Sequence, residues 1–545
     1  MISSLKEKKE IIDLYYNNRR LNIDIFSDTY RGGMDDNLFI PFSFFDIKKE
    51  WINHLNEEQK PIIDFYIHIP FCLSICKFCD YYKEVPNKES IGNYLEYLYN
   101  YLNEYKEIFK GYTFRGLYIG GGTPSMLSLK QIDDLLLYIF ENFKFSENGE
   151  KTFEVNPINI NNAKMKIIAK YGINRISMGV QSLDPDVLKK ANRDYQGEKV
   201  VSNAINIIKK HGINDISLDV VMGLKEDNLV NIILTLRKIY SFNPSNIILY
   251  WLLPTDTYLD EHFKGNLELF YDESFKKIEL YHKYLSKNID KIGKFDEIKI
   301  DKNNGYRWDL TIKKFDIEKY DDFSSASLFG VGASARSHIF GKIYYETISD
   351  LNLKYNTNFD VKSFGKNIDI KDEISLYSII NIMNTGIIKL PDFKNIFALD
   401  FEEIYEKELD YFYKKNKAEK ISNKEIKFYL HYKEKNYYAL FFLFNEKLYD
   451  KKYIFNNKNK IYLKFKNGLE LSILFKIENS KISYILNNHN SFTIDNLFYY
   501  YKICKNLDKI IISLSIDNND LLYIIKKIIY ILGTKYKNNL KIIGI

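Results

Sequence analysis

The chain has 545 residues, 46% of them hydrophobic, and a formal net charge of +6 at pH 7. This length and apolar content allow more than one buried core and exclude a disordered protein. Lys is spread along the chain and matched by Asp and Glu, so we expect no nucleic-acid partner. No run of 18 uncharged apolar residues occurs, the N-terminus lacks a signal-type apolar segment, and four cysteines are too few for a disulfide framework. We therefore expect a cytoplasmic protein without a membrane span.

A mixed extension, residues 1–60, precedes a regular alternation of apolar runs and amphipathic patterns. Six short apolar runs are interpreted as strands, at residues 64–69, 116–120, 152–155, 175–180, 216–221 and 246–251. Helical patterns alternate with them, at residues 90–109, 129–143, 161–171, 184–210 and 226–241. Strands that alternate with helices are typical of a parallel sheet with helical crossovers. The prediction is an α/β fold with a partial (β/α)6 TIM-type barrel over residues 61–260.

Three further regions follow the predicted barrel. Residues 261–370 are expected to complete the barrel and to contact the substrate, and residues 371–450 have the pattern of a mainly helical domain. Residues 451–545 are expected to form an additional α+β module. Within this module Asn467-Gly468 separates two alternating runs, which indicates a two-residue hairpin, and residues 518–531 have a helical pattern.

Three of the four cysteines lie in one short stretch, CLSICKFC, soon after the first predicted strand. Cys72, Cys76 and Cys79 place three soft thiolates on one loop, which suits a soft metal centre. Zinc is an alternative, but structural zinc usually has four ligands in paired Cys-x2-Cys motifs, and no second pair occurs. Cys504 is more than 400 residues away. Three thiolates on a four-iron cluster leave one iron open for a small-molecule ligand.

Other glycine and polar residues lie at the ends of the predicted strands, where TIM-type barrels carry their chemistry. Gly120–Gly122 follow the second strand and would let the backbone approach a ligand closely. Glu154 lies at the end of the third strand. A buried carboxylate needs a donor, which an ammonium group, a ribose hydroxyl or a structural ion pair could provide. Tyr66 and His68 share one face of the first strand, because alternate residues point the same way.

These motifs resemble the radical S-adenosylmethionine (SAM) superfamily, and within it the oxygen-independent coproporphyrinogen III oxidase family. The resemblance covers about residues 40–450 and is carried by YIHIPFC, CLSICKFC, YIGGGTPS, EVNP, RISMGVQSLD, NRDY and LDVVMGL. It implies that Cys72, Cys76 and Cys79 bind a [4Fe-4S] cluster and that SAM binds the open iron. It also implies that reduction of SAM gives a 5′-deoxyadenosyl radical, which takes a hydrogen atom from the substrate.

The resemblance further implies roles for individual residues. Those implied in cofactor binding are Tyr66, Phe78, Gly121, Gly122, Thr123, Glu154, Gln181, Arg193 and Asp219. Gly121, Gly122 and Thr123 would contact the amino group of SAM. Gln181 and Arg193 would donate to its ribose and carboxylate, and Asp219 would contact the ribose or the adenine. Tyr66 and His68, beside the cluster, are the implied catalytic residues.

The family includes oxidases, haem chaperones, haem-opening enzymes and methyltransferases. Asp80-Tyr81 follows the third cysteine where the oxidases carry Gly-Cys, and GYRWDL and GVGASARS lack the histidines of the chaperones. Our first hypothesis is a radical SAM oxidoreductase that decarboxylates tetrapyrrole propionates in haem biosynthesis. The alternatives are a haem-binding chaperone and a radical C-methyltransferase on another substrate. The resemblance also implies a one-electron donor such as flavodoxin or ferredoxin.

Overall fold

The computed structural model describes residues 40–442, except 58–60, 80, 88, 253, 302–306, 319–325, 348–362, 369, 431–437 and 439–440, together with five strands between residues 460 and 543. The contacts divide the chain into two compact units, Phe42–Phe442 and Met1–Pro41 with Leu443–Ile545. None of the helices in the described ranges is long and apolar enough to cross a membrane. The finer domain boundaries drawn from the sequence stay predictions.

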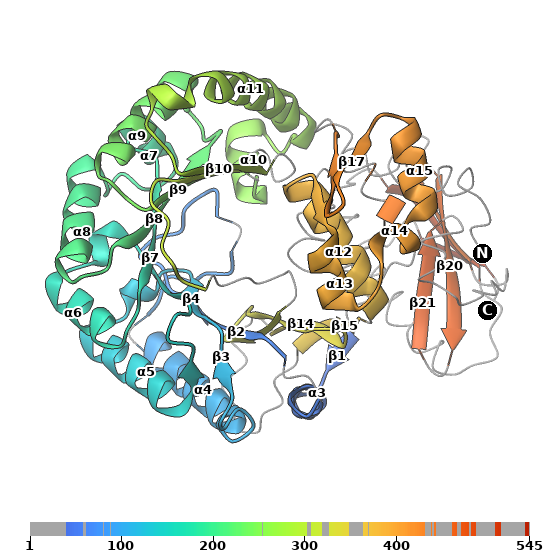
Figure 1. The fold of residues 1–545 in the computed structure, drawn as a ribbon, viewed down its shortest axis with the longest axis horizontal. Helices are drawn as coiled ribbons and strands as arrows, with labels where there is room; N and C mark the ends of the chain where they lie inside the picture. Colours follow the sequence, from blue (N-terminus) through green and yellow to red (C-terminus); the bar gives the residue numbers. More distant parts are fainter. Residues whose placement is uncertain are drawn as a thin grey trace. The chain divides into compact units, whose positions relative to one another are not determined.

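Six parallel strands form the barrel wall at the six predicted positions (Figure 1). They are β2 (Ile63–Ile69), β4 (Leu117–Gly121), β6 (Lys151–Val155), β7 (Arg175–Gln181), β8 (Asp215–Met222) and β9 (Asn246–Trp251). Each strand pairs in parallel with the next in this order. The sequential order places the carboxyl ends of all six strands at one edge of the sheet.

Helices follow the strands and cover the outer side of the sheet (Figure 1). They are α4 (Ser90–Lys106), α5 (Leu129–Asn142), α6 (Asn162–Lys170), α7 (Pro185–Lys190), α8 (Glu198–Lys210) and α9 (Leu229–Ser241). Local sequence fixes several of their starts; α5, for example, begins with a capping box between Ser128 and Gln131. The single helix predicted over 184–210 is wrong. It divides into α7 and α8 because Asn192 has a left-handed φ of +60° and Gly197 is an extended N-cap.

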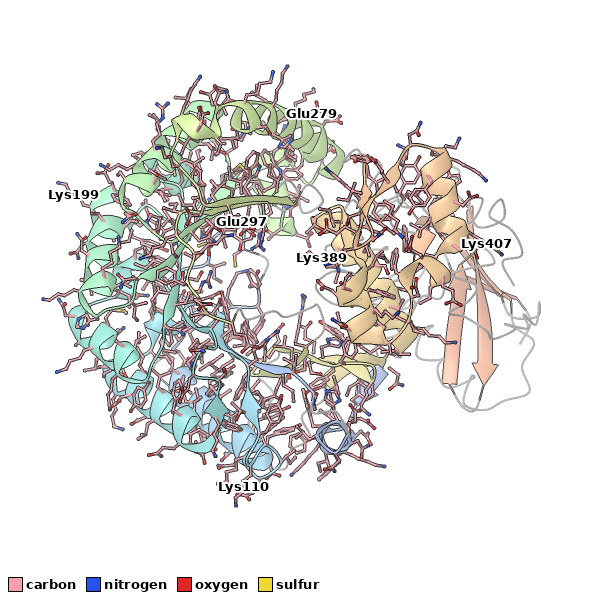
Figure 2. All side chains as sticks on the ribbon, in the orientation of Figure 1. Lys110, Lys199, Glu279, Glu297, Lys389 and Lys407 are labelled. Atoms are coloured by element: carbon pink, nitrogen blue, oxygen red, sulfur yellow. The ribbon has the colours of Figure 1, made fainter. Side chains whose placement is uncertain are left out.

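Alternate residues of each barrel strand face either the helices or the interior. In β2, Phe65, Ile67 and Ile69 are fully buried in the core that strands and helices share. Tyr66 and His68 therefore face the interior, because successive side chains of a strand point to opposite sides. Exposed charged side chains such as Lys110 and Lys199 project outward from the helical layer (Figure 2). The polar interior of the sheet is thus separated from solvent-facing charge by a continuous apolar layer.

Further strands extend the sheet at both margins. Beyond β9 lie β11 (Arg307–Thr311) and β10 (Glu297–Asp301), both antiparallel to their neighbours. Beyond β2 lie β12 (Ser327–Val331), β13 (Arg336–Ile339), β14 (Ile343–Thr347), β15 (Ser363–Asn367) and β1 (Ile40–Phe42). Helices α3 (Phe44–Leu55), α10 (Asp256–Phe263) and α11 (Leu267–Asn288) and the short parallel pair β3 (Thr113–Phe114) and β5 (Lys144–Phe145) complete this part. The described strands run from β1 to β10 without closing, as a partial barrel should.

The last part of the first unit is mainly helical in the residues described. It contains α12 (Ile370–Asn384), α13 (Leu390–Phe397), α14 (Phe401–Ile404) and α15 (Glu406–Lys414), with the three-stranded sheet β16 (Ile387–Lys389), β18 (Glu425–Phe428) and β17 (Ala418–Ser422). Buried aromatic residues such as Phe393, Phe401 and Tyr405 form its core.

The second unit contains a five-stranded sheet. Its order is β21 (Lys481–Leu486), β20 (Glu470–Glu478), β19 (Lys460–Phe465), β22 (Leu507–Ser513) and β23 (Leu540–Ile543). β19 and β20 pair antiparallel, with Lys464 opposite Glu470, while the turn at Asn467-Gly468 lies outside the described residues, so the two-residue hairpin stays a prediction. Cys504 and the helix predicted over 518–531 also lie outside them.

Candidate functional site

The cysteine loop leaves β2 at the carboxyl edge of the barrel. Its base is closed by backbone hydrogen bonds, from the Cys72 amide to the Glu84 carbonyl (2.9 Å) and from the Glu84 amide to the Pro70 carbonyl (2.7 Å). The Cys79 amide donates to the Cys76 carbonyl at 3.2 Å, which tightens the turn between these two cysteines. All three thiols of the loop are free and partly exposed, as ligands of an added group must be.

Hydrogen-bond donors from other strand ends approach the thiols. Cys72 Sγ lies 3.5 Å from Thr123 Oγ1, at the end of β4. Cys76 Sγ lies 3.5 Å from an Nη atom of Arg193, which follows α7. Burial raises the pKa of Cys72 to about 11, so the isolated thiol stays protonated at neutral pH. A cationic iron cluster would reverse this, because metals bind the thiolate, and the donor set of three cysteines fits such a group.

The glycine turn after β4 packs against β2. Gly121 has a φ of +112°, and a Cβ there would lie 2.7 Å from the His68 ring. A Cβ on Gly122 would lie 2.7 Å from the Pro70 carbonyl carbon. The Gly122 amide also donates to the Ile69 carbonyl at 2.8 Å. The sequence predicts close approach of this backbone to a ligand; the structure shows that it also lies against the strand leading to the cysteines.

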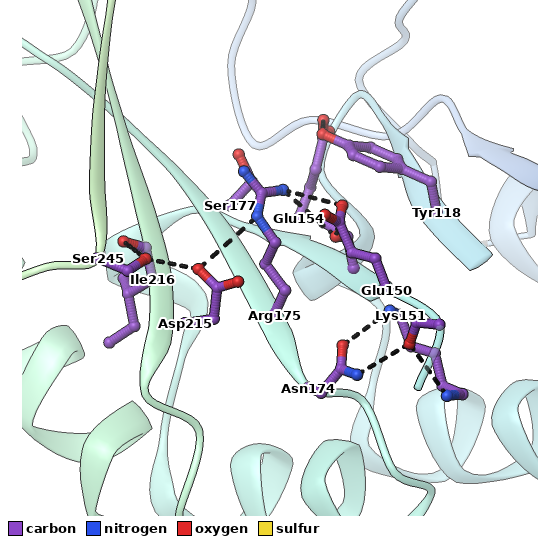
Figure 3. Close-up of polar contacts among 12 residues, drawn as sticks. Tyr118, Glu150, Lys151, Glu154, Asn174, Arg175, Ser177, Asp215, Ile216 and Ser245 are labelled. Atoms are coloured by element: carbon purple, nitrogen blue, oxygen red, sulfur yellow. Dashed lines mark hydrogen bonds and ion pairs between the residues drawn. The ribbon is translucent and has the colours of Figure 1, made fainter. Parts of the chain in front are cut away.

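Glu154 lies below the glycine turn, with its carboxylate held from two sides. Tyr118 Oη donates to Glu154 Oε1 (2.7 Å), and the Gly121 amide donates to Oε2 (3.0 Å) (Figure 3). Burial raises the pKa of Glu154 to about 7, and the nearby Asp219 carboxylate adds to this effect, while the hydrogen bond from Tyr118 opposes it. The sequence does not single out Tyr118, whose place one strand away from Glu154 depends on the pairing of β4 with β6.

Two buried oxygens near Glu154 have no partner among the described residues. Ser177 Oγ donates to Asp219 Oδ2 at 3.2 Å, but Asp219 Oδ1 and Gln181 Oε1 accept no hydrogen bond. Gln181 has a left-handed φ of +67° at a bulge between β7 and β8, and such strain, of about 1–3 kcal/mol, collects at functional sites. Unpaired buried acceptors are costly, so they indicate a polar ligand that donates hydrogen bonds here.

Arg193 and Phe78 both attach the cysteine loop to its surroundings. An Nη atom of Arg193 donates to the Gly179 carbonyl at 2.8 Å, and the guanidinium also contacts Gln196 Oε1. Arg193 is therefore buried and oriented, not the surface arginine that a helix end would suggest by default. Phe78 packs into the apolar cluster around Val187 and Ala191. Its predicted contact with a cofactor stays a prediction.

Tyr66 and His68 form a chain of hydrogen bonds on the inner face of β2. His68 Nε2 lies 3.0 Å from the Tyr82 carbonyl, so this nitrogen carries the proton and donates it. Nδ1 then accepts from Tyr66 Oη at 2.8 Å. Burial lowers the pKa of His68 to about 4, which keeps the ring neutral. Both ring nitrogens are thus occupied, and the predicted catalytic role of His68 stays a prediction.

An ion-pair layer closes the other end of the barrel (Figure 3). Arg175 is the first residue of β7; its Nη1 lies 3.4 Å from Glu150 Oε1 and its Nε lies 3.9 Å from Asp215 Oδ1. Ser245 Oγ donates to the same oxygen of Asp215 at 2.5 Å. In barrels of this type the amino ends of the strands carry stability and the carboxyl ends carry chemistry. The sequence holds a signal for this layer, because Arg175 and Asp215 each stand at the start of an apolar run.

Replacing Glu154 by Gln should change how stability depends on pH. The pKa of the Glu154 carboxyl is about 7 in the folded protein and 4.5 for a glutamate in the unfolded chain, so folding favours the protonated carboxyl. The contribution of Glu154 to the free energy of unfolding is therefore complete below pH 4.5 and is lost as pH rises through 7. We expect Glu154→Gln to match the wild type at pH 4.5 and to be more stable at pH 8, on the order of a few kcal/mol. Chemical unfolding of the cluster-free proteins at both pH values measures this; equal stability at pH 8 would contradict it.

Comparison with known proteins agrees with this geometry. Residues 66–239 match the Radical SAM superfamily. The heme chaperone HemW of Lactococcus lactis is 27% identical over 64% of this chain and 88% of its own length. The oxygen-independent coproporphyrinogen III oxidase of Escherichia coli is 31% identical, but over only 36% of this chain and 43% of its own length.

The solved structure of E. coli coproporphyrinogen III oxidase (HemN) shares the fold, with a TM-score of 0.61 and 21% identity over 74% of this chain and 93% of that protein. This likeness confirms the predicted α/β fold class, and the family match confirms the predicted cofactors. Residues 66–239 are therefore a radical SAM domain that uses a [4Fe-4S] cluster and SAM, in a chain that resembles the oxygen-independent coproporphyrinogen III oxidases and the heme chaperones HemW.

Proposed function

We propose that this protein is a radical SAM enzyme acting on a tetrapyrrole, with Cys72, Cys76 and Cys79 holding the cluster. When bound, the cluster and SAM supply a carbon-centred radical after reduction by one electron. The observation that carries the proposal is the pair of unpartnered buried oxygens, on Asp219 and Gln181, at the same barrel edge as the three free thiols. They would provide acceptors for the two hydroxyl groups of a ribose.

The remaining residues would orient SAM by charge. Glu154, when ionised, would pair with an ammonium group, and the cost of burying its charge makes such a partner favourable. Arg193 would contribute a cation for a carboxylate, since it is already held in place by Gly179 and Gln196. Thr123 and the turn Gly121–Gly122 would bring backbone groups between these charges and Cys72. Tyr66, next to His68, would face the ligand from β2.

The tetrapyrrole substrate is supported by the two groups of relatives, a chaperone named for heme and a coproporphyrinogen oxidase. In the oxidase reaction, hydrogen abstraction β to a propionate carboxylate is followed by loss of carbon dioxide and of one electron to an acceptor, which leaves a vinyl group. The second candidate function is heme binding without turnover. It is favoured by the longer match to HemW, which extends over 88% of that relative.

One anaerobic experiment separates these functions. The reconstituted protein, with SAM and a strong reductant, is given coproporphyrinogen III in one reaction and heme in another. Mass spectrometry of the tetrapyrroles should show loss of carbon dioxide from the porphyrinogen if the protein is an oxidase. Tight heme binding without a product would support the second candidate. Cleavage of SAM while neither tetrapyrrole binds or changes would contradict both.

A further inference from the structure

Arg336, an arginine outside the six barrel strands, lies two strands away from Tyr66 in the same sheet. Arg336 in β13 pairs directly with Glu346 in β14. On its other side β13 pairs with β12 through His338 and Leu328, and the same register continued by two residues would bring Arg336 opposite Gly330, whose amide donates to Ser337 Oγ. Gly330 in turn pairs with Tyr66 of β2. These strands thus carry one row of residues, Glu346, Arg336, Gly330 and Tyr66.

The absence of a side chain at Gly330 lets β13, the strand that carries Arg336, lie close against β12. A Cβ on Gly330 would lie 2.0 Å from the Arg336 carbonyl oxygen, so a larger residue there would push β13 away from β12. Burial lowers the pKa of His68, and the positive charge of Arg336 lowers it further. Arg336 nonetheless keeps 40% of its side chain exposed. Arg336 is therefore a cation with an accessible side chain, and it can bind a ligand.

The guanidinium of Arg336 is oriented by its neighbours. Its Nε donates to Glu346 Oε2 at 3.3 Å, and Ser334 Oγ donates to Glu346 Oε1 at 2.5 Å. Ser334 has a left-handed φ of +58°, a strained conformation for serine that brings it to Glu346. A planar guanidinium held in this way can present two parallel N–H groups to a carboxylate.

A second arginine occupies the opposite margin of the inner face. Arg307 in β11 lies over the Tyr250 ring of β9, 5.0 Å from its centroid, and its Nε donates to Asp309 at 3.0 Å. Like Arg336, it lies outside the strands β4 to β8, which carry Glu154, Gln181 and Asp219. The two cations thus lie at opposite margins of the six parallel strands.

We infer that Arg336 and Arg307 are the residues that bind two carboxylates of the substrate and so orient it within the barrel. The inference rests on the proposed function and names the residues that would position its substrate. One carboxylate would sit beside Tyr66, where the row of β13, β12 and β2 ends, and another beside Tyr250. Two fixed guanidiniums at opposite margins would set which part of the substrate faces the cofactors.

The test compares a polycarboxylate with its ester. Coproporphyrin III, a stable coloured tetracarboxylate, and its tetramethyl ester are titrated into the reconstituted holoenzyme and followed by absorbance. We expect Arg336→Gln to raise the Kd for coproporphyrin III about tenfold to a hundredfold, as loss of a charge-assisted pair implies, and Arg307→Gln to act in the same direction. The ester should bind weakly to the wild type and equally weakly to the variants. A merely structural role would weaken both ligands together.

Three further measurements make the outcome decisive. Arg237→Gln on the exposed side of α9 is the matched control and should leave both Kd values unchanged. SAM binding should be unaffected in Arg336→Gln. If that variant fails to hold its cluster, Arg336→Lys, which keeps the charge and loses the fork, replaces it and should give an intermediate Kd. Equal binding by wild type and variants, or tight binding of the ester, overturns the inference alone. Absence of coproporphyrin binding to the wild type overturns the proposed function as well.

Discussion

Replacement of Cys72, Cys76 or Cys79 by alanine is expected to abolish the iron–sulfur cluster. Anaerobically reconstituted wild type should be brown and hold about four irons per chain, as a cubane requires. The three thiols lie on one loop whose base is fixed by the hydrogen bonds between Cys72, Glu84 and Pro70. Removing one thiolate leaves two protein ligands, and the described loop offers no other thiol. Iron and sulfide content and the visible absorbance of each variant measure the loss.

The control for this experiment is Cys504→Ala, which should keep the full iron content. The fold of the cysteine variants should survive, because all three side chains are partly exposed and the loop is closed by backbone groups. Thermal unfolding of the cluster-free proteins should therefore coincide with that of the wild type. Zinc in place of iron after anaerobic reconstitution, or a single-cysteine variant with four irons, would overturn the assignment.

Gly121→Val is expected to remove SAM binding and to lower stability, with the cluster still present. At φ +112° a β-branched residue is strained by about 1–3 kcal/mol. The added side chain would also start 2.7 Å from the His68 ring, which is held by Tyr66 and by the Tyr82 carbonyl and cannot move aside easily. To relieve this clash the backbone at residue 121 would have to shift, which would move the Gly121 amide away from Glu154. Isothermal titration with SAM and chemical unfolding measure the two effects.

The matched control for Gly121→Val is Gly172→Val. Gly172 also has a left-handed φ, +78°, but a Cβ there meets nothing within 4 Å. This variant should show the backbone strain alone and bind SAM normally. If Gly121→Val binds SAM as tightly as the Gly172 variant does, the turn after β4 is not part of the SAM site, and the proposed placement of the cofactor fails.

Buried carboxyls inside the barrel lower the stability of the ligand-free protein and are available to bind a ligand. Glu154 and Asp219 are both buried carboxyls, and burial raises their pKa to about 7 and about 6. An unpaired buried charge lowers stability unless a ligand compensates it. The Arg175 layer at the opposite end is paired instead with Glu150 and Asp215, and so contributes to holding the strands together. The charged groups of the Arg175 layer are thus paired with one another, whereas the buried carboxyls at the other end of the barrel would gain stability from a bound ligand.

The sequence by itself determined the six barrel strands and the cysteine loop. The strands are short apolar runs bounded by turn residues, a local pattern that needs no knowledge of the rest of the chain. The strand-end positions of Glu154 and Gln181 follow from that pattern as well. The pattern fails at residues 184–210, where apolar spacing continues through a break. There the conformation of Asn192 and the burial of Arg193 under β7 end the helix, and both depend on tertiary contacts.

Only the tertiary structure decided which side chains meet across the barrel. Arg336 comes within two strands of Tyr66 although 270 residues separate them, because the pairing of β13, β12 and β2 is fixed by packing between distant strands. A shift of one residue would turn every side chain of a strand to the other face, and local sequence cannot specify that choice. The same holds for the bond between Tyr118 and Glu154 and for the acceptors left unpaired on Gln181 and Asp219. Such contacts follow from strand pairing over long range, which no short motif records.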